Sequence, residues 1–188
     1  MAIPKLIFCC GMIRSGSTVL YQMAAGIVEM RGIGQRCGYY EPPAEPEPPS
    51  WGWSVYKVPW LCEREQRAIR NGAIALYSHR DIEESLTSAY RAFGVPEGNR
   101  WLWRALCEGA EREMRAFDSP AVNRIPFSSI RESLGAVIAE VAAIIPGRTL
   151  AAEEIGGLIA ELSLDRQRSR PKVAPYDPHT LICPQHFN

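Results

Sequence analysis

The eight residues from Gly11 to Thr18, which read Gly-Met-Ile-Arg-Ser-Gly-Ser-Thr, constrain the fold of this chain more than any other stretch. An apolar run over residues 6–10 precedes them and is typical of a buried parallel strand. The residues that follow predict a helix over 17–30, which ends before two nearby glycines. A glycine-bounded loop between a strand and a helix N-terminus directs backbone N–H groups at an anion. The pattern therefore predicts a phosphate-binding loop.

This loop has the spacing of a Walker A motif but lacks its lysine. The motif G-x-x-x-x-G-K-[ST] needs that lysine on the terminal phosphates of a nucleoside triphosphate. Ser17 stands in its place here, and the basic residue of the loop comes earlier, at Arg14. The departure argues against an ordinary P-loop kinase, although a kinase with a degenerate loop stays open as an alternative.

Strand and helix patterns alternate along the rest of the chain. We expect strands over 53–58, 73–77 and 122–127, and helices over 61–71, 81–93, 100–117, 130–145 and 151–162. Asp81 is the expected N-cap of its helix. The proline-rich residues 42–50 predict a surface loop, and residues 166–188 a C-terminal tail. The alternation predicts one α/β domain over 1–188, a parallel sheet flanked by helices, with its ligand edge at the strand C-termini.

Composition narrows the class of partner and the compartment. Lys and Arg together number 21, as do Asp and Glu, so the formal net charge is zero, which argues against a general nucleic-acid surface. No apolar run is long enough to span a membrane, and the N-terminus shows no secretory pattern. The six cysteines form no C-x-x-C pair or zinc pattern, so we expect reduced thiols and a cytoplasmic protein. Adjacent Cys9 and Cys10 are expected on opposite faces of their strand.

Two motifs together resemble the sulfotransferase family. Arg14-Ser15-Gly16-Ser17-Thr18 looks like the 5′-phosphosulfate loop of that family, and Arg80 and Ser88 match in type and spacing its arginine and serine for the 3′-phosphate. A guanidinium can grip a phosphate through two N–H bonds, and the hydroxyl adds a donor. The resemblance implies a sulfotransferase-like P-loop fold, the donor 3′-phosphoadenosine 5′-phosphosulfate (PAPS) and no metal. The donor-binding residues that it implies are Arg14, Ser15, Gly16, Ser17, Thr18, Arg80 and Ser88.

Within that family, two further stretches resemble the tyrosylprotein sulfotransferases. These are Arg36-Cys37-Gly38-Tyr39-Tyr40-Glu41, beside the family's R-C-G-E-E, and Lys57-Val58-Pro59-Trp60. The resemblance implies that Lys57 and Arg14 act on the leaving phosphate. It also implies that Glu41, one position from the family glutamate, is the base that takes the acceptor proton. His79 is the alternative base.

The expected reaction is the transfer of a sulfuryl group from PAPS to the hydroxyl of a small molecule or a peptide, without nucleic acid or membrane as partner. Chemistry of this kind depends on positioning and charge stabilisation. Two alternatives stay open: a P-loop nucleotide or small-molecule kinase, and a nucleotide-binding module without catalysis.

Overall fold

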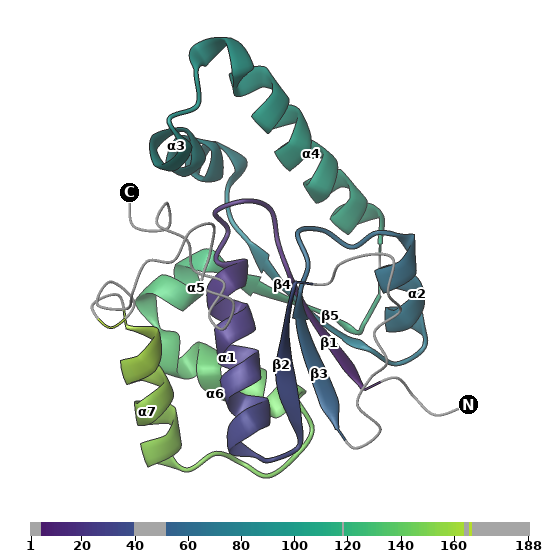
Figure 1. The fold of residues 1–188 in the computed structure, drawn as a ribbon, viewed down its shortest axis with the longest axis vertical. Coiled ribbons are helices and arrows are strands. Elements are labelled where there is room, and N and C mark those ends of the chain that lie inside the picture. Colours follow the sequence, from purple (N-terminus) through teal and green to yellow (C-terminus); the bar gives the residue numbers. More distant parts are fainter. Residues whose placement is uncertain (1–4, 40–51, 118, 164–165, 167–188) are drawn as a thin grey trace.

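The computed structural model describes residues 5–39, 52–117, 119–163 and 166. Its centre is a five-stranded sheet in the order β2-β3-β1-β4-β5, in which every neighbouring pair is parallel (Figure 1). The strands are β1 (Leu6–Cys10), β2 (Gly34–Tyr39), β3 (Trp53–Lys57), β4 (Ile74–His79) and β5 (Val122–Pro126). The predicted parallel α/β sheet is confirmed. Strand β2, at one edge, was not predicted.

The helices are α1 (Ser17–Met30), α2 (Glu63–Arg70), α3 (Ile82–Phe93), α4 (Arg100–Ala116), α5 (Phe127–Glu132), α6 (Leu134–Ile144) and α7 (Ala152–Leu162), with a 3₁₀ turn at Glu97–Asn99. The Asp81 side chain accepts the Glu84 N–H at 3.0 Å, so the predicted N-cap of α3 is confirmed. The single helix predicted over 130–145 is wrong. Ser133 has φ −143° and ψ 52°, outside the helical region, and separates α5 from α6.

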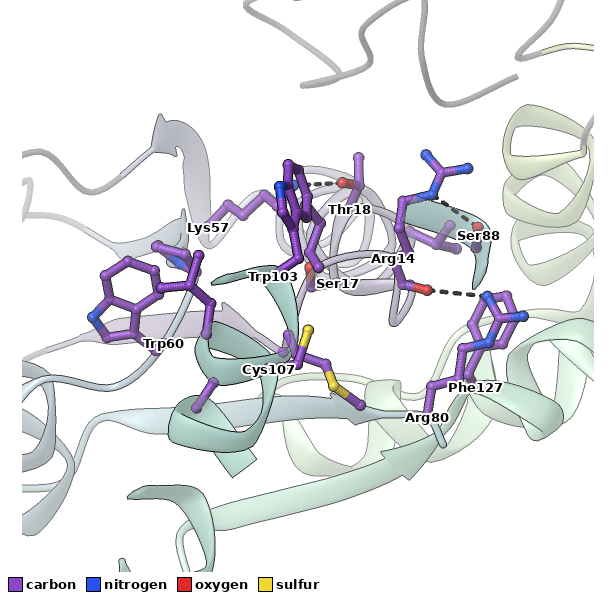
Figure 2. Close-up of a pocket in the computed structure, with 18 of the residues that line it drawn as sticks. Arg14, Ser17, Thr18, Lys57, Trp60, Arg80, Ser88, Trp103, Cys107 and Phe127 are labelled. Atoms are coloured by element: carbon purple, nitrogen blue, oxygen red, sulfur yellow. Dashed lines mark hydrogen bonds between the residues drawn. The ribbon is translucent and has the colours of Figure 1, made fainter. Parts of the chain in front are cut away.

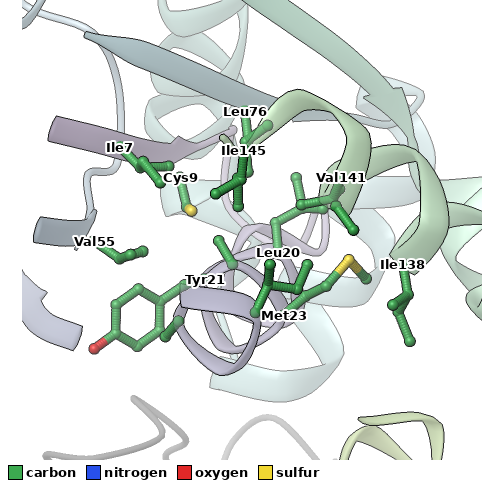
Figure 3. Close-up of a cluster of buried hydrophobic side chains, with 14 of the residues drawn as sticks. Ile7, Cys9, Leu20, Tyr21, Met23, Val55, Leu76, Ile138, Val141 and Ile145 are labelled. Atoms are coloured by element: carbon green, nitrogen blue, oxygen red, sulfur yellow. The ribbon is translucent and has the colours of Figure 1, made fainter. Parts of the chain in front are cut away.

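The sheet is buried on both faces, as parallel sheets are. On one face, α1 and α6 cover Ile7, Cys9 and Val55 (Figure 3). On the other face, Cys10 lies in a second cluster that also holds Met114, near the end of α4. The two adjacent cysteines therefore occupy opposite faces, as expected, and both are free thiols.

Helices α3 and α4 extend beyond the end of the sheet, where the strands finish (Figure 1). We call this pair the helical arm, residues 82–116. Leu86 of α3 and Cys107 of α4 pack together with Met12 of the loop after β1. The helical arm is thereby packed against the loop after β1, while Trp101 and Leu102 remain 69% and 46% exposed.

Among the helices that the structure describes, none has the length and apolar character to cross a bilayer. The proline-rich residues 42–50 and the tail, apart from Arg166, lie outside the described residues, and so does Glu41.

Candidate functional site

A cavity of about 760 Å³ lies where the strands end, between the loop after β1 and the helical arm. Its lining includes Tyr39 at the end of β2, Lys57 at the end of β3, and Arg80 just after β4. The carboxyl ends of parallel strands meet at one edge, which is where ligands of open α/β sheets bind. The volume is in the range of small-molecule and cofactor sites.

The loop after β1 depends on glycine at two positions. Gly11 has φ +153°, and a Cβ there would lie 2.4 Å from the Ser78 carbonyl oxygen. Gly16 has φ +95° and is the N-cap of α1. Arg14 also adopts a left-handed conformation, with φ 62°. Such strain persists in a non-glycine residue where the surroundings hold it, and it is common at ligand sites.

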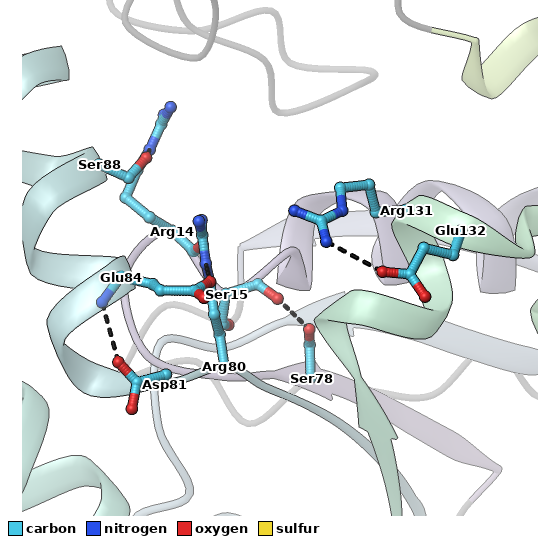
Figure 4. Close-up of polar contacts among 9 residues, drawn as sticks. All are labelled: Arg14, Ser15, Ser78, Arg80, Asp81, Glu84, Ser88, Arg131 and Glu132. Atoms are coloured by element: carbon cyan, nitrogen blue, oxygen red, sulfur yellow. Dashed lines mark hydrogen bonds and ion pairs between the residues drawn. The ribbon is translucent and has the colours of Figure 1, made fainter.

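Part of the loop's hydrogen bonding is internal. The Ser15 N–H donates to the Met12 carbonyl at 3.1 Å, and the Ser78 hydroxyl donates to the Ser15 carbonyl (Figure 4). Ser15 itself is fully buried, and it is not among the residues that line the cavity. The Ser15 N–H therefore has an acceptor within the loop, and the role of Ser15 in donor binding stays a prediction. The loop residues that line the cavity at the start of α1 are Gly16, Ser17 and Thr18, where helix N–H groups have no intrahelical acceptor.

Lys57 supplies a cation beside this helix start. Its side chain is only 8% exposed, and its Nζ donates to Thr18 Oγ1 at 2.5 Å and to the Tyr39 hydroxyl at 3.2 Å (Figure 2). A loop that lacks the Walker lysine therefore receives an ammonium group from the neighbouring strand. Hydrogen bonds to oxygen compensate for the cost of burying this charge.

Arg14 and Arg80 form a second cationic group on the same side (Figures 2 and 4). Arg14 Nε donates to Ser88 Oγ at 3.1 Å, which joins the loop to α3. Arg80 Nη1 donates to the Arg14 carbonyl at 3.2 Å, and its Nε donates to Glu84 at 3.1 Å. The Arg80 guanidinium also lies 4.5 Å above the centre of the Phe127 ring. The structure thus brings together the residues that the two motifs singled out.

Another part of the cavity lining is apolar. We call it the apolar wall: Phe93, Trp103, Leu106 and Cys107 of the helical arm, with Trp60 after β3. Figure 2 labels Trp60, Trp103 and Cys107. The Phe93 and Trp103 rings stack with their centres 5.3 Å apart. Burial raises the pKa of the Cys107 thiol, which keeps this group neutral and the wall uncharged.

We call the basic part of the lining the cationic wall: the loop with Arg14, the first turn of α1, Lys57 and Arg80. Among the described residues, the lining of the cavity also includes Arg131 and contains no Asp, Glu or His. Such a surface suits an anionic ligand. His79, the alternative base, stacks on Tyr77 at 6.4 Å and is not part of this lining. Within the described part of the chain, no cluster of His, Cys, Asp or Glu could hold a metal ion.

No family model matches the sequence, and no curated protein matches it significantly. Solved structures do match. Mouse sulfotransferase SULT7A1 complexed with PAP is 11% identical with a TM-score of 0.66, and the match covers 95% of this chain and 72% of that one. Retinol dehydratase with PAP matches with a TM-score of 0.64, both with androsterone (16% identical) and with retinol (15%), over 90% of this chain and 67% of that one.

These structures bind PAP, as their descriptions state, and at such low identity the likeness concerns the fold. The resemblance to the tyrosylprotein subtype stays a prediction. The chain has the sulfotransferase-like fold, an α/β fold whose five-stranded parallel sheet is flanked by helices.

Proposed function

We propose that this protein transfers a sulfuryl group from PAPS to a hydroxyl acceptor. The observation that carries the proposal is the cationic wall, where Arg14, Lys57 and Arg80 surround the start of α1 in one cavity. PAPS carries phosphates at two separated positions, and this wall offers two separated cationic groups. Residues of these types fit both phosphates through charge-assisted hydrogen bonds.

The donor is expected to lie along the cationic wall. The N–H groups of Gly16, Ser17 and Thr18 would hold the oxygens of the 5′-phosphosulfate, since a helix N-terminus favours negative charge. Arg80 and Ser88 would hold the 3′-phosphate. The contact between Arg14 and Ser88 supports this arrangement, because it keeps the two phosphate motifs together before any ligand binds.

The reaction forms a bond between the acceptor oxygen and sulfur while the bond from sulfur to the bridging phosphate oxygen breaks. Negative charge grows on that bridging oxygen, and Arg14 and Lys57 would stabilise it in a site shielded from water. The acceptor proton must leave as the new bond forms. We propose the Glu41 carboxylate as the base, in line with the sequence motif; Glu41 lies outside the described residues.

The apolar wall favours a small apolar acceptor over a peptide. Its aromatic and aliphatic side chains can bury a flat or branched hydrocarbon with its hydroxyl directed at Lys57. Retinol and androsterone, each bound in a structure of the similar protein retinol dehydratase, are molecules of this kind. A charged or extended polar acceptor would leave its polar groups against Trp103 and Leu106 without partners.

The decisive experiment measures binding of PAP by calorimetry in EDTA, beside ATP with and without Mg²⁺. We expect PAP to bind without metal and to raise the melting temperature by mass action. Tighter binding of ATP with Mg²⁺ than of PAP would favour the kinase alternative. Turnover of PAPS with a panel of apolar alcohols and phenols then separates an enzyme from an inactive nucleotide-binding module.

A further inference from the structure

We infer that Tyr39 is a positioning residue for Lys57, and that a bulge in strand β2 exists to place it there. The inference rests on the proposed function, because Lys57 is assigned there to the leaving oxygen. Nothing in the sequence motifs gives Tyr39 a role, and the strand that carries it was not predicted.

The contact between the two side chains is direct. Tyr39 and Lys57 are the last residues of two neighbouring strands and are paired in the register of β2 with β3. Lys57 Nζ donates to the Tyr39 hydroxyl at 3.2 Å and lies 5.1 Å from the centre of its ring. Both side chains line the cavity. The phenol therefore offers the ammonium group an acceptor oxygen and a ring face together.

The register shows why the bulge matters. Arg36 pairs with Val55, but the next pair is Gly38 with Tyr56, so Cys37 is an extra residue in β2. Without the extra residue, the register would continue from Arg36 opposite Val55 and would place Gly38 opposite Lys57. Glycine has no side chain to reach the ammonium group. The bulge moves Tyr39 into that position, which is a known use of bulges beside functional sites.

Contacts from α1 hold the bulge in place. Gly38 has φ +83°, a left-handed conformation that favours glycine. Its N–H donates to the Tyr21 hydroxyl at 3.0 Å, and burial raises the pKa of Tyr21 to about 12, so this phenol stays neutral. One residue before the bulge, Arg36 Nε donates to Glu29 of α1 at 2.7 Å. Strand β2 is thus fixed on both sides of the extra residue.

A lysine needs such support because its long side chain is flexible and its ammonium group has no preferred plane. The hydroxyls of Thr18 and Tyr39 each accept an N–H of Lys57, which restricts the orientation of its ammonium group. Thr18 belongs to the helix start that faces the donor, so a bound phosphosulfate would share its hydroxyl. Tyr39 lies at the end of strand β2, so its hydrogen bond with Lys57 would remain when the donor is bound. A displacement of about 1 Å at a reacting centre can cost about 100-fold in rate.

The first test uses Tyr39→Phe, which keeps the ring and removes the hydroxyl. We expect kcat to fall about tenfold, while the KM for PAPS changes less than about twofold. Tyr90→Phe is the matched control, since its hydroxyl donates to the Arg100 carbonyl on the helical arm and Tyr90 does not line the cavity. It should leave kcat unchanged. Unchanged kcat in Tyr39→Phe would overturn the inference.

The second test asks whether Tyr39 acts through Lys57. In a Lys57→Met background, Tyr39→Phe should cause no further loss, because the group that it orients is absent. A further loss of about tenfold in that background would show that Tyr39 acts by packing or on the substrate directly, and would overturn the inference.

A third measurement needs no turnover. The chain has lysines at positions 5, 57 and 172, so acylation of Lys57 can be read by mass spectrometry against Lys5 as an internal reference. The Tyr39 hydroxyl holds the Lys57 ammonium group in a buried position, so Tyr39→Phe should raise the labelling of Lys57 relative to Lys5. Equal labelling in both proteins would overturn the inference. If the wild-type protein bound PAP yet transferred no sulfuryl group, the proposed function would fail, and the labelling would still decide the role of Tyr39.

Discussion

The two walls of the cavity are built in different ways. On the cationic wall, Lys57 is 8% exposed and donates hydrogen bonds to two hydroxyls. Arg14 donates to the Ser88 hydroxyl, and Arg80 donates to the Arg14 carbonyl. On the apolar wall, Phe93 is 39% exposed and Leu106 57%. The first wall stands on the edge of a parallel sheet, and most of the second on the helical arm beyond it (Figure 1).

The difference follows from the kind of interaction that each wall offers. Charge-assisted hydrogen bonds depend on distance and angle, so their groups must be held in place before the ligand arrives. Apolar contact has no direction and depends on the area buried, so a wall of exposed aromatic and aliphatic groups can accept several shapes. The comparison suggests one fixed donor and a more tolerant choice of acceptor.

The largest effect should come from Lys57→Met, which removes the ammonium group of the cationic wall. We expect kcat to fall by about 100-fold or more, because the lost charge acts on a transition-state oxygen. The affinity for PAPS should change less than about threefold, because this charge has not yet developed in the bound donor. Steady-state kinetics and calorimetry on the same preparation measure both quantities.

Arg131→Met is a suitable control for Lys57→Met. Arg131 also lines the cavity, but its side chain is 63% exposed and pairs with Glu132. We expect a loss in kcat of less than about fivefold, since exposed charges contribute little. An equal loss in the two variants would mean that the net charge of the cavity matters and the place of Lys57 does not.

The second effect concerns the other end of the donor. Arg80→Ala should weaken PAP by about 30-fold, or about 2 kcal/mol, because a charge-assisted contact to the 3′-phosphate is lost. Adenosine 5′-phosphate, which lacks that group, should bind as it does to the wild type. The PAP affinity of Arg80→Lys should fall between those of the wild type and Arg80→Ala, since lysine keeps the charge without the planar guanidinium. Equal weakening of both ligands by Arg80→Ala would assign Arg80 to the structure of the loop.

The cationic wall could be largely predicted from the sequence because most of its residues sit in two local motifs. The loop Gly11–Thr18 connects a strand directly to a helix, and Arg80 and Ser88 belong to one further strand-to-helix connection. The N-cap at Asp81 and the bounds of α1 were predicted for the same reason. Local patterns fix local structure, and the parallel order of the strands then brings both motifs to one edge.

What could not be predicted depends on contacts between distant segments. Strand β2 contains two glycines and no β-branched residue, so its local preference for a strand is weak, and pairing with β3 supplies the rest. The contact from Tyr39 to Lys57 depends on a bulge that no pattern signals. The break at Ser133 falls inside residues 130–145, which read as one helix in the sequence. The apolar wall requires the placement of α4 against the loop, which only the tertiary structure defines.

The third prediction tests the tolerance of the apolar wall. Leu106→Ser should raise the KM for an apolar acceptor by about fivefold, roughly 1 kcal/mol for a partly exposed side chain, and leave PAP binding unchanged. Leu102→Ser, one helical turn earlier on α4, is the control because Leu102 is exposed and does not line the cavity. A similar rise in both variants would show that the helical arm as a whole, and not the wall, contacts the acceptor.

The smallest effect should come from Glu84→Gln, which alters the surroundings of Arg80. The Glu84 carboxylate accepts a hydrogen bond from Arg80 Nε at 3.1 Å and is 61% exposed, so the pair is a surface ion pair of small net stability. Its negative charge lies beside the proposed place of the 3′-phosphate. Removing that charge should raise the affinity for PAP by about twofold to threefold, and the gain should shrink as salt screens the repulsion.

Glu83→Gln is the matched control for this change. Glu83 lies in the same turn of α3 but pairs with Arg104 of α4, so its removal should not change PAP binding. The Asp81 cap remains in both variants, which keeps the helix start intact. If Glu84→Gln weakened PAP instead, the carboxylate would be orienting the Arg80 guanidinium for its ligand. The cationic wall would then include an acidic residue that holds its arginine in place, as Tyr39 is proposed to hold Lys57.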